Sequence, residues 1–176
     1  MGIVNTISAK DLKMEYLKAI CNIIQTEMNL GENNVWIYNQ KRDIPNDFGL
    51  YIVVSEVGST LIGSKLAYDT TNGFEEVQSV HSLNSVDINI FSRSSQARTR
   101  KNEVIMALNS TYSQQVQEAN SFSIGRISSS FTNTSELEET AEMNRFTINF
   151  NVTNMTQKRK AVNYYDTFSK NVITEA

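Results

Sequence analysis

The stretch that decides the fold is Asn144-Arg145-Phe146-Thr147-Ile148-Asn149-Phe150-Asn151-Val152. Apolar and polar side chains alternate through it without a break. Successive side chains of a β-strand point to opposite faces of the sheet, so this period of two predicts a strand with one face in a core. The whole chain is therefore expected to be built around a sheet that is covered on one face.

A second strand shows the same alternation earlier in the chain. Val86, Ile88 and Ile90 share one face, while Asp87 and Asn89 share the other. We interpret this strand as the returning arm of a long hairpin. The hairpin extends from Ser59 to Phe91 and turns at Thr71-Asn72-Gly73. The outgoing arm carries Ile62, Leu66 and Tyr68 on one face, and further strands are predicted at Val35–Tyr38, Leu50–Val57 and Phe122–Ile127.

Two segments have the spacing of amphipathic helices. The first is expected from about Ala9 to Asn29, where Ser8 and Asp11 resemble a capping box and Gly31 supplies the stop. The second is expected from about Ser95 to Glu118. Its apolar stripe, suited to lying on a sheet, consists of Ala97, Val104, Ile105, Leu108, Tyr112 and Val116.

These patterns predict one α+β domain over residues 1–176. We expect a mixed, mostly antiparallel β-sheet with a long β-hairpin, flanked by two main helices. The core should span about residues 8–155, with a C-terminal extension over about 156–176. The polar segment Ser128–Glu142 lacks strong periodicity, so it is expected to be either mobile or ordered by a partner.

Composition restricts the classes of function. The formal net charge is −3, and the chain contains 20 Asn, 19 Ser and 15 Thr but a single Pro. A chain without basic excess lacks the usual electrostatic basis for nucleic-acid binding, so any such contact must be local. No apolar run approaches the length of a membrane span, and no secretory leader is evident, so we expect a soluble intracellular protein. Cys21, the one cysteine, is expected to be a buried helix residue.

The motifs that could carry catalytic or phosphate-binding chemistry are incomplete. His81 is the only histidine, and Ser85 and Asp87 follow it on the same predicted strand face, spread too far to converge as a triad. Gly58-Ser59-Thr60-Leu61-Ile62-Gly63-Ser64-Lys65 is close to a phosphate-binding loop, but its last two residues are reversed and a strand pattern continues. We therefore expect no enzyme activity, no catalytic residue, no metal and no cofactor.

Charge clusters are the better candidates for function, as a subunit interface. Arg93, Arg98, Arg100 and Lys101 lie at the start of the second predicted helix, where the helix dipole disfavours cations. An acidic partner would offset this cost, and the candidates on another subunit are Glu136, Glu138, Glu139 and Glu142. A solvated helix start and a nucleic-acid contact are the alternatives. Tyr164 and Tyr165 would add apolar area to the interface.

Several segments together resemble the neck or tail terminator proteins of tailed bacteriophages. They are Asn39-Gln40 before Pro45, Asp87–Arg93 leading into Asn102–Leu108, Asn144–Val152, and Ala161-Val162-Asn163-Tyr164-Tyr165-Asp166. Their order along the chain follows that of the family, so the likeness spans most of the sequence. None of these motifs is chemically diagnostic.

The resemblance implies a structural virion protein that is assembled in the host cytoplasm. Copies of the chain would form a hexameric ring that caps the tail tube beneath the head-tail connector. The implied partners are other copies, tail tube and sheath proteins, connector proteins, and genomic DNA that passes without sequence-specific binding; no membrane is involved. The alternatives are a connector stopper, a baseplate or tail component, and a nucleic-acid-binding module.

Overall fold

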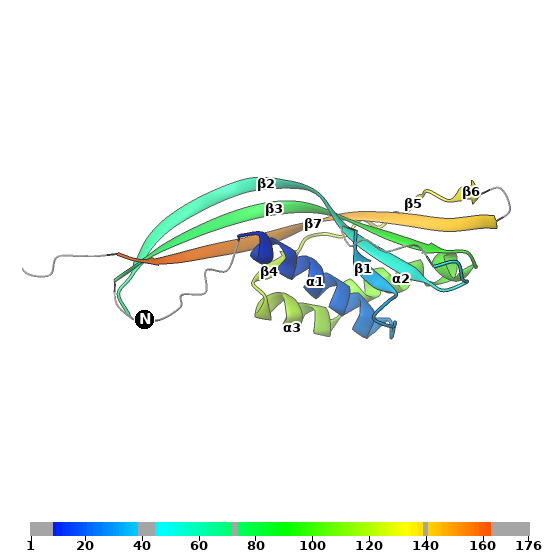
Figure 1. Cartoon of the computed structure of the whole chain (residues 1–176), viewed down its shortest axis with the longest axis horizontal. Coiled ribbons are helices and arrows are strands. Elements are labelled where there is room, and N and C mark those ends of the chain that lie inside the picture. The colour runs from blue at the N-terminus through cyan, green and yellow to red at the C-terminus, as the bar shows by residue number, and fades with distance from the viewer. Residues whose placement is uncertain (1–8, 39–44, 72–73, 139–140, 163–176) are drawn as a thin grey trace, which may run out of the picture.

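The computed structural model describes residues 9–38, 45–71, 74–138 and 141–162. Its elements follow the order predicted for an α+β protein (Figure 1). They are α1 (Ala9–Glu27), β1 (Val35–Ile37), β2 (Tyr51–Asp69), β3 (Glu75–Ser92), α2 (Gln96–Leu108), α3 (Thr111–Ala119), β4 (Phe122–Ile124), β5 (Thr132–Asn133), β6 (Glu136–Glu138) and β7 (Ala141–Ala161).

The strands form one mixed sheet in the order β1-β2-β3-β7-β4, with β5 and β6 also pairing with β7. β1 runs parallel to β2, and the other pairings are antiparallel. The predicted fold class, a mostly antiparallel sheet with a long hairpin and helices packed on it, is therefore confirmed. The hairpin consists of β2 and β3, and both arms are longer than an average strand.

The ladder between β3 and β7 is the longest regular feature of the sheet. It runs without a register shift from Glu75 opposite Ala161 to Ser92 opposite Asn144. In the same ladder Val86 pairs with Phe150, and Ile88 pairs with Ile148. Because directly opposite residues of an antiparallel pair lie on the same face, the two alternating patterns combine into one apolar surface. This is the surface that the helices cover.

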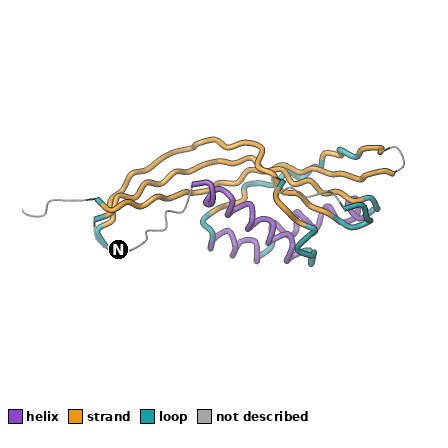
Figure 2. Tube along the Cα trace, viewed as in Figure 1, coloured by secondary structure: helices purple, strands orange, loops and turns teal. Residues whose placement is uncertain are grey.

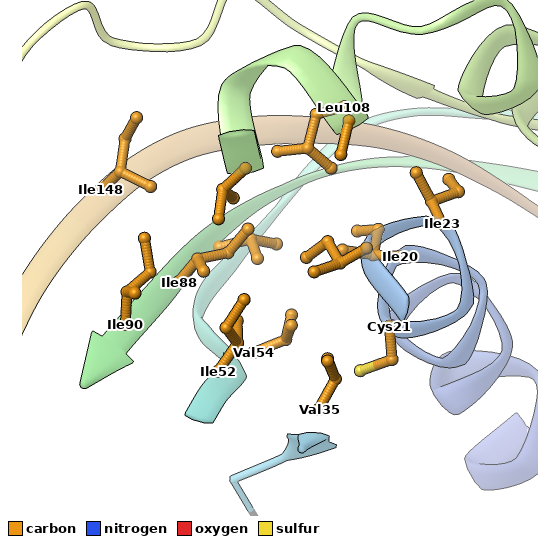
Figure 3. Close-up of a cluster of buried hydrophobic side chains, with 14 of the residues drawn as sticks. Ile20, Cys21, Ile23, Val35, Ile52, Val54, Ile88, Ile90, Leu108 and Ile148 are labelled. Atoms are coloured by element: carbon orange, nitrogen blue, oxygen red, sulfur yellow. The ribbon is translucent and has the colours of Figure 1, made fainter. Parts of the chain in front are cut away.

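The three helices lie on that one face of the sheet (Figures 1 and 2). Ile20 and Ile23 of α1 and Leu108 of α2 meet the sheet residues Ile52 and Ile88 in a buried cluster (Figure 3). All five side chains are at most 2% exposed. This layer of helices against a sheet forms the main hydrophobic core.

Part of the opposite face is buried as well, where β2 begins and β3 ends. Trp36, Tyr51, Val53, Phe91 and Met143 form a second apolar cluster there. The rings of Trp36 and Phe91 meet edge to face, with their centroids 5.8 Å apart, which is a favoured geometry for aromatic pairs. Leu50–Val57 was predicted as a separate buried strand, but it is the first part of β2, which continues through Gly58 to Asp69. Burial of neighbouring residues on both faces explains why Tyr51–Val54 shows no alternation.

The second predicted helix, Ser95–Glu118, is two helices. α2 ends before Asn109, and Ser110 adopts an extended backbone and begins α3. The Ser110 hydroxyl accepts a hydrogen bond from the Ser113 amide at 3.0 Å, which caps the new helix. The apolar spacing continues across the break, so the periodicity did not reveal it.

Two expectations about the polar segments also need correction. Parts of Ser128–Glu142 are ordered by the chain itself: β5 and β6 pair with β7, and the Thr134 amide donates to the Arg145 carbonyl at 2.9 Å. Residues 156–161, assigned to a C-terminal extension, are the last residues of β7. Only the part of that extension after residue 162 lies outside the described residues.

We predict that Ile88→Ala lowers the free energy of unfolding by about 2–5 kcal/mol, because it leaves a cavity between the sheet and the helices. The matched control is Ile62→Ala, since Ile62 is the same residue type at 60% exposure. The control should lower stability by less than about 1 kcal/mol. Urea denaturation measures both, and equal losses would contradict the proposed core.

Candidate subunit interface

The turn between β3 and α2 sets the position of the predicted basic cluster. Ser94 donates its amide to the Ser92 hydroxyl at 3.1 Å, and the Ser94 hydroxyl donates to the Phe48 carbonyl at 3.0 Å. Hydroxyls that bond to nearby backbone groups stabilise turns, which explains the Ser-rich sequence here. The turn places the half-buried Arg93 just before α2, which begins at Gln96.

Arg100 is committed to contacts within its own chain. Its guanidinium donates to the Glu103 carboxylate at 2.7 to 3.1 Å, and Nη2 also donates to the Met28 carbonyl at 3.0 Å. The second bond joins α2 to the end of α1. The Arg100 guanidinium therefore has hydrogen-bond acceptors within its own chain and does not need an acidic group from a neighbouring subunit.

Lys101 and Arg98 join α2 to β7. The Lys101 ammonium lies 4.3 Å from the centre of the Phe146 ring, a cation–π contact. Arg98 is exposed, and its Nη2 donates to Asn144 Oδ1 at 3.4 Å. The two contacts offset the unfavourable position of cations at a helix start. Of the predicted basic cluster, Arg98 is the exposed member.

The predicted acidic cluster lies close to these basic residues in the same chain. Glu136 and Glu138 belong to β6 and Glu142 belongs to β7, in a pairing that places Leu137 opposite Glu142. Asn144, the partner of Arg98, follows two residues after Glu142. Figure 1 shows β6 and the start of β7 at one end of the long axis. The acidic and basic clusters therefore lie at the same end of one molecule.

This placement changes the interpretation of the predicted interface. In a ring, a surface on one side of each subunit meets a different surface of the next. Two clusters at one end of the chain do not supply those two sides. Glu139, Tyr164 and Tyr165, the other predicted interface residues, lie outside the described residues.

The predicted chemical sites show no convergent geometry in the described part of the chain. His81, Ser85 and Asp87 share one face of β3, as expected. At about 3.3 Å per residue, His81 and Ser85 are roughly 13 Å apart along the strand. Gly58 and Lys65 both lie in β2, so the segment that is similar to a phosphate-binding loop is a strand.

The described residues contain no group of three or more His, Cys, Asp or Glu side chains that could hold a metal ion. None of the described helices is long and apolar enough to cross a membrane.

The face of the sheet opposite the helices carries a polar hollow that the sequence analysis did not identify. Its volume is about 900 Å³, and it lies between the sheet and residues 128–134. The polar groups of the hollow bond to one another: Thr147 donates to Asn89 Oδ1 at 2.8 Å, and Arg145 donates to the same atom at 3.2 Å. The alternation of Asp87 and Asn89 in the sequence was its only signal.

Cys21 is buried in α1, as predicted. Burial raises the pKa of its thiol to about 12, because a thiolate would lose its hydration there. The thiolate is the reactive form of cysteine, so the thiol of the folded protein is inert near neutral pH.

Comparison with known proteins gives no assignment. No family model matches the sequence, and no curated protein matches it.

We predict that Arg100→Glu lowers the free energy of unfolding by about 1–3 kcal/mol. It removes the bonds to Glu103 and Met28 and places two carboxylates together. Arg98→Glu is the matched control, because it reverses the charge of an exposed arginine on the same helix, and it should lower the free energy of unfolding by less than about 1 kcal/mol. Thermal and urea unfolding of both variants measure the difference, and equal stability would exclude a structural role for Arg100.

We also predict that a thiol-specific reagent labels Cys21 slowly in the folded protein at pH 8 and rapidly in urea, where the thiol regains its ordinary pKa. The raised pKa also means that the Cys21 contribution to stability is complete below about pH 9 and is lost as the pH rises toward about 12. Rapid labelling of folded protein at pH 8 would contradict the burial of the thiol.

Proposed function

We propose that this chain is a structural subunit of a tailed-bacteriophage neck, a tail terminator whose copies form a ring at the end of the tail tube. The observation that carries the proposal is an elongated sheet whose strands continue beyond the helix layer (Figure 2). These strands expose apolar side chains. A single chain gains no stability from leaving such side chains in water. Contact with other protein surfaces would bury them.

The resemblance in the sequence supplies the identity of those surfaces. The neighbours would be other copies of the chain, tail tube and sheath proteins on one side, and connector proteins on the other. The alternatives of connector stopper and baseplate component use the same kind of surface. They differ from a terminator in their position in the particle.

We predict that cryo-electron microscopy of the assembled phage tail places this chain in a six-fold ring between the tail tube and the head-tail connector. The assembled tail is imaged because the position of the ring in the particle separates a terminator from a connector stopper or a baseplate component. Density at the baseplate would favour the alternative. A single copy per particle, or a two-fold dimer, would exclude the ring.

A further inference from the structure

The distal arm is the part of the sheet formed by residues 57–69 of β2, 75–84 of β3 and 153–161 of β7. Figures 1 and 2 show these three strands extending past the helices at one end of the molecule. The described residues include ten large apolar side chains that are exposed, and seven of them lie in this arm. They are Val57, Leu61, Ile62, Leu66, Tyr68, Val80 and Leu83.

The register shows which face of the arm is apolar. β3 has no register shift against β7, so Val80 shares a face with the buried Val86 and Ile88. Leu66 pairs with Gln78 and Tyr68 pairs with Glu76, which places both on that same face. The face that the helices cover elsewhere therefore continues along the arm as an exposed apolar stripe on the β2 side.

The β7 side of this face is basic. Lys158 pairs with Gln78 and Lys160 pairs with Glu76, so both lysines share the face of the apolar stripe. Arg159 points to the opposite face, where it bonds to Asp69 at 2.9 Å and to Glu75 at 3.3 Å. Among the described residues, neither Lys158 nor Lys160 makes an ion pair of 4.0 Å or less. Both lysines are exposed.

The outer edges of the arm are open. β1 pairs with β2 only at Ile52–Val54, and β4 pairs with β7 only at Val152–Asn154. Beyond these residues, neither outer edge of the arm has a strand partner in the described part of the chain. An open edge offers unpaired backbone groups to an extended segment of another chain.

A segment of complementary chemistry lies at the other end of the molecule. The acidic hairpin, defined as β6 with residues 141–143 of β7, contains Glu136, Glu138 and Glu142 together with Leu137. It is extended, as the open arm requires, and Figure 1 shows it at the opposite end of the long axis from the distal arm. One molecule thus carries a basic and apolar surface at one end and an acidic strand pair at the other.

We propose that the distal arm is the docking surface for the acidic hairpin of a second copy of this chain. Glu136 and Glu138 occupy one face of the hairpin, and that face lies against Lys158 and Lys160. The extended segment covers the stripe of Leu66, Tyr68 and Val80. Because the two surfaces are different and lie at opposite ends, the contact is head-to-tail and repeats from copy to copy. This inference rests on the proposed function, because head-to-tail contacts close into a ring only when each copy is rotated relative to the one before it.

The test uses two charge-reversed variants of the full chain. The arm variant is Lys158→Glu with Lys160→Glu, and the hairpin variant is Glu136→Lys with Glu138→Lys. Each variant alone brings like charges together, so its self-association constant should fall by about tenfold or more relative to wild type. An equimolar mixture should recover association to within about threefold of wild type, because each variant complements the other at both contacts.

Sedimentation velocity over a concentration series measures association, and circular dichroism confirms that each variant is folded. The matched control is Lys18→Glu with Lys65→Glu, which changes the net charge as the arm variant does. Lys18 is on α1 and Lys65 is on the opposite face of the arm. The control should leave association within about threefold of wild type, and wild-type association should weaken with added salt.

A second measurement does not depend on charge. Lys158→Cys in one tagged copy and Glu138→Cys in another should form a disulfide between copies, whereas Lys18→Cys with Glu138→Cys should not. Cys21 does not compete, because it is buried.

Wild-type protein that stays monomeric at all concentrations, a mixture that does not recover association, or failure of the first cysteine pair to cross-link would overturn the docking site. Loss of binding to duplex DNA by the arm variant, with self-association unchanged, would assign the lysines to nucleic acid instead. These results are separate from the imaging of the tail. A ring whose neighbours meet through other surfaces would overturn the docking site and leave the proposed function standing.

Discussion

The continuous register between β3 and β7 is the constraint on which the rest of the structure depends. A shift of one residue would place Ile88 and Ile148 on opposite faces of the sheet, so that the helices would cover the polar side chains of one of the two strands. The register is well specified because both strands alternate strongly at the same positions. The irregularity of the hairpin is confined to β2, where shifts occur between Glu56 and Gly58 and between Leu61 and Gly63.

The ladder between β3 and β7 is part of a sheet that is longer than the helix layer, so the sheet extends beyond the helices at both ends of the molecule. The helices cover the central sheet, where the aromatic cluster around Trp36 closes part of the other face. β3 and β7 continue beyond that region toward Glu75 and Ala161, and the sheet there has no second layer among the described residues. At the other end, β7 continues toward residue 141, where β6 pairs with it. Both surfaces of the proposed contact exist because the sheet extends beyond the helices that pack on it.

Elements with one buried face could be predicted from the sequence, because their apolar residues recur with a regular period. Segments without a buried face show no such period and were missed. The strand around Phe146–Val152, the Val86–Ile90 end of the returning hairpin arm and the first helix were predicted correctly because one face of each is in the core. Residues 156–161 were not recognised as strand because most of them are exposed on both faces, so no period of two appears. The break at Ser110 was missed because the apolar spacing continues across it. The helix ends there because Ser110 adopts an extended backbone, and its hydroxyl caps the next helix.

The candidate site was harder to predict, because its residues act through partners that are remote in the sequence. The cations of α2 were recognised as unfavourable at a helix start. The groups that compensate them are the Met28 carbonyl, directly after α1, and the Phe146 ring of β7. The polar residues of the outer face were noted at Asp87 and Asn89 without their partners on β7. The local sequence therefore identified the cations and their unfavourable position at a helix start. Which groups they contact depends on the topology of the fold.

The same reasoning explains how an exposed apolar arm can exist on a folded chain. Regular open edges promote uncontrolled pairing between chains, and bulges and charged side chains oppose it. The register shifts near Val57 and Ile62 interrupt the β2 edge, and Lys65 places a charge on its remaining regular part. On β7, Lys158 and Lys160 repel a second copy of the same edge. These features disfavour pairing of like edges while leaving the arm open to an acidic strand, so the charges that suppress unspecific association also select the partner.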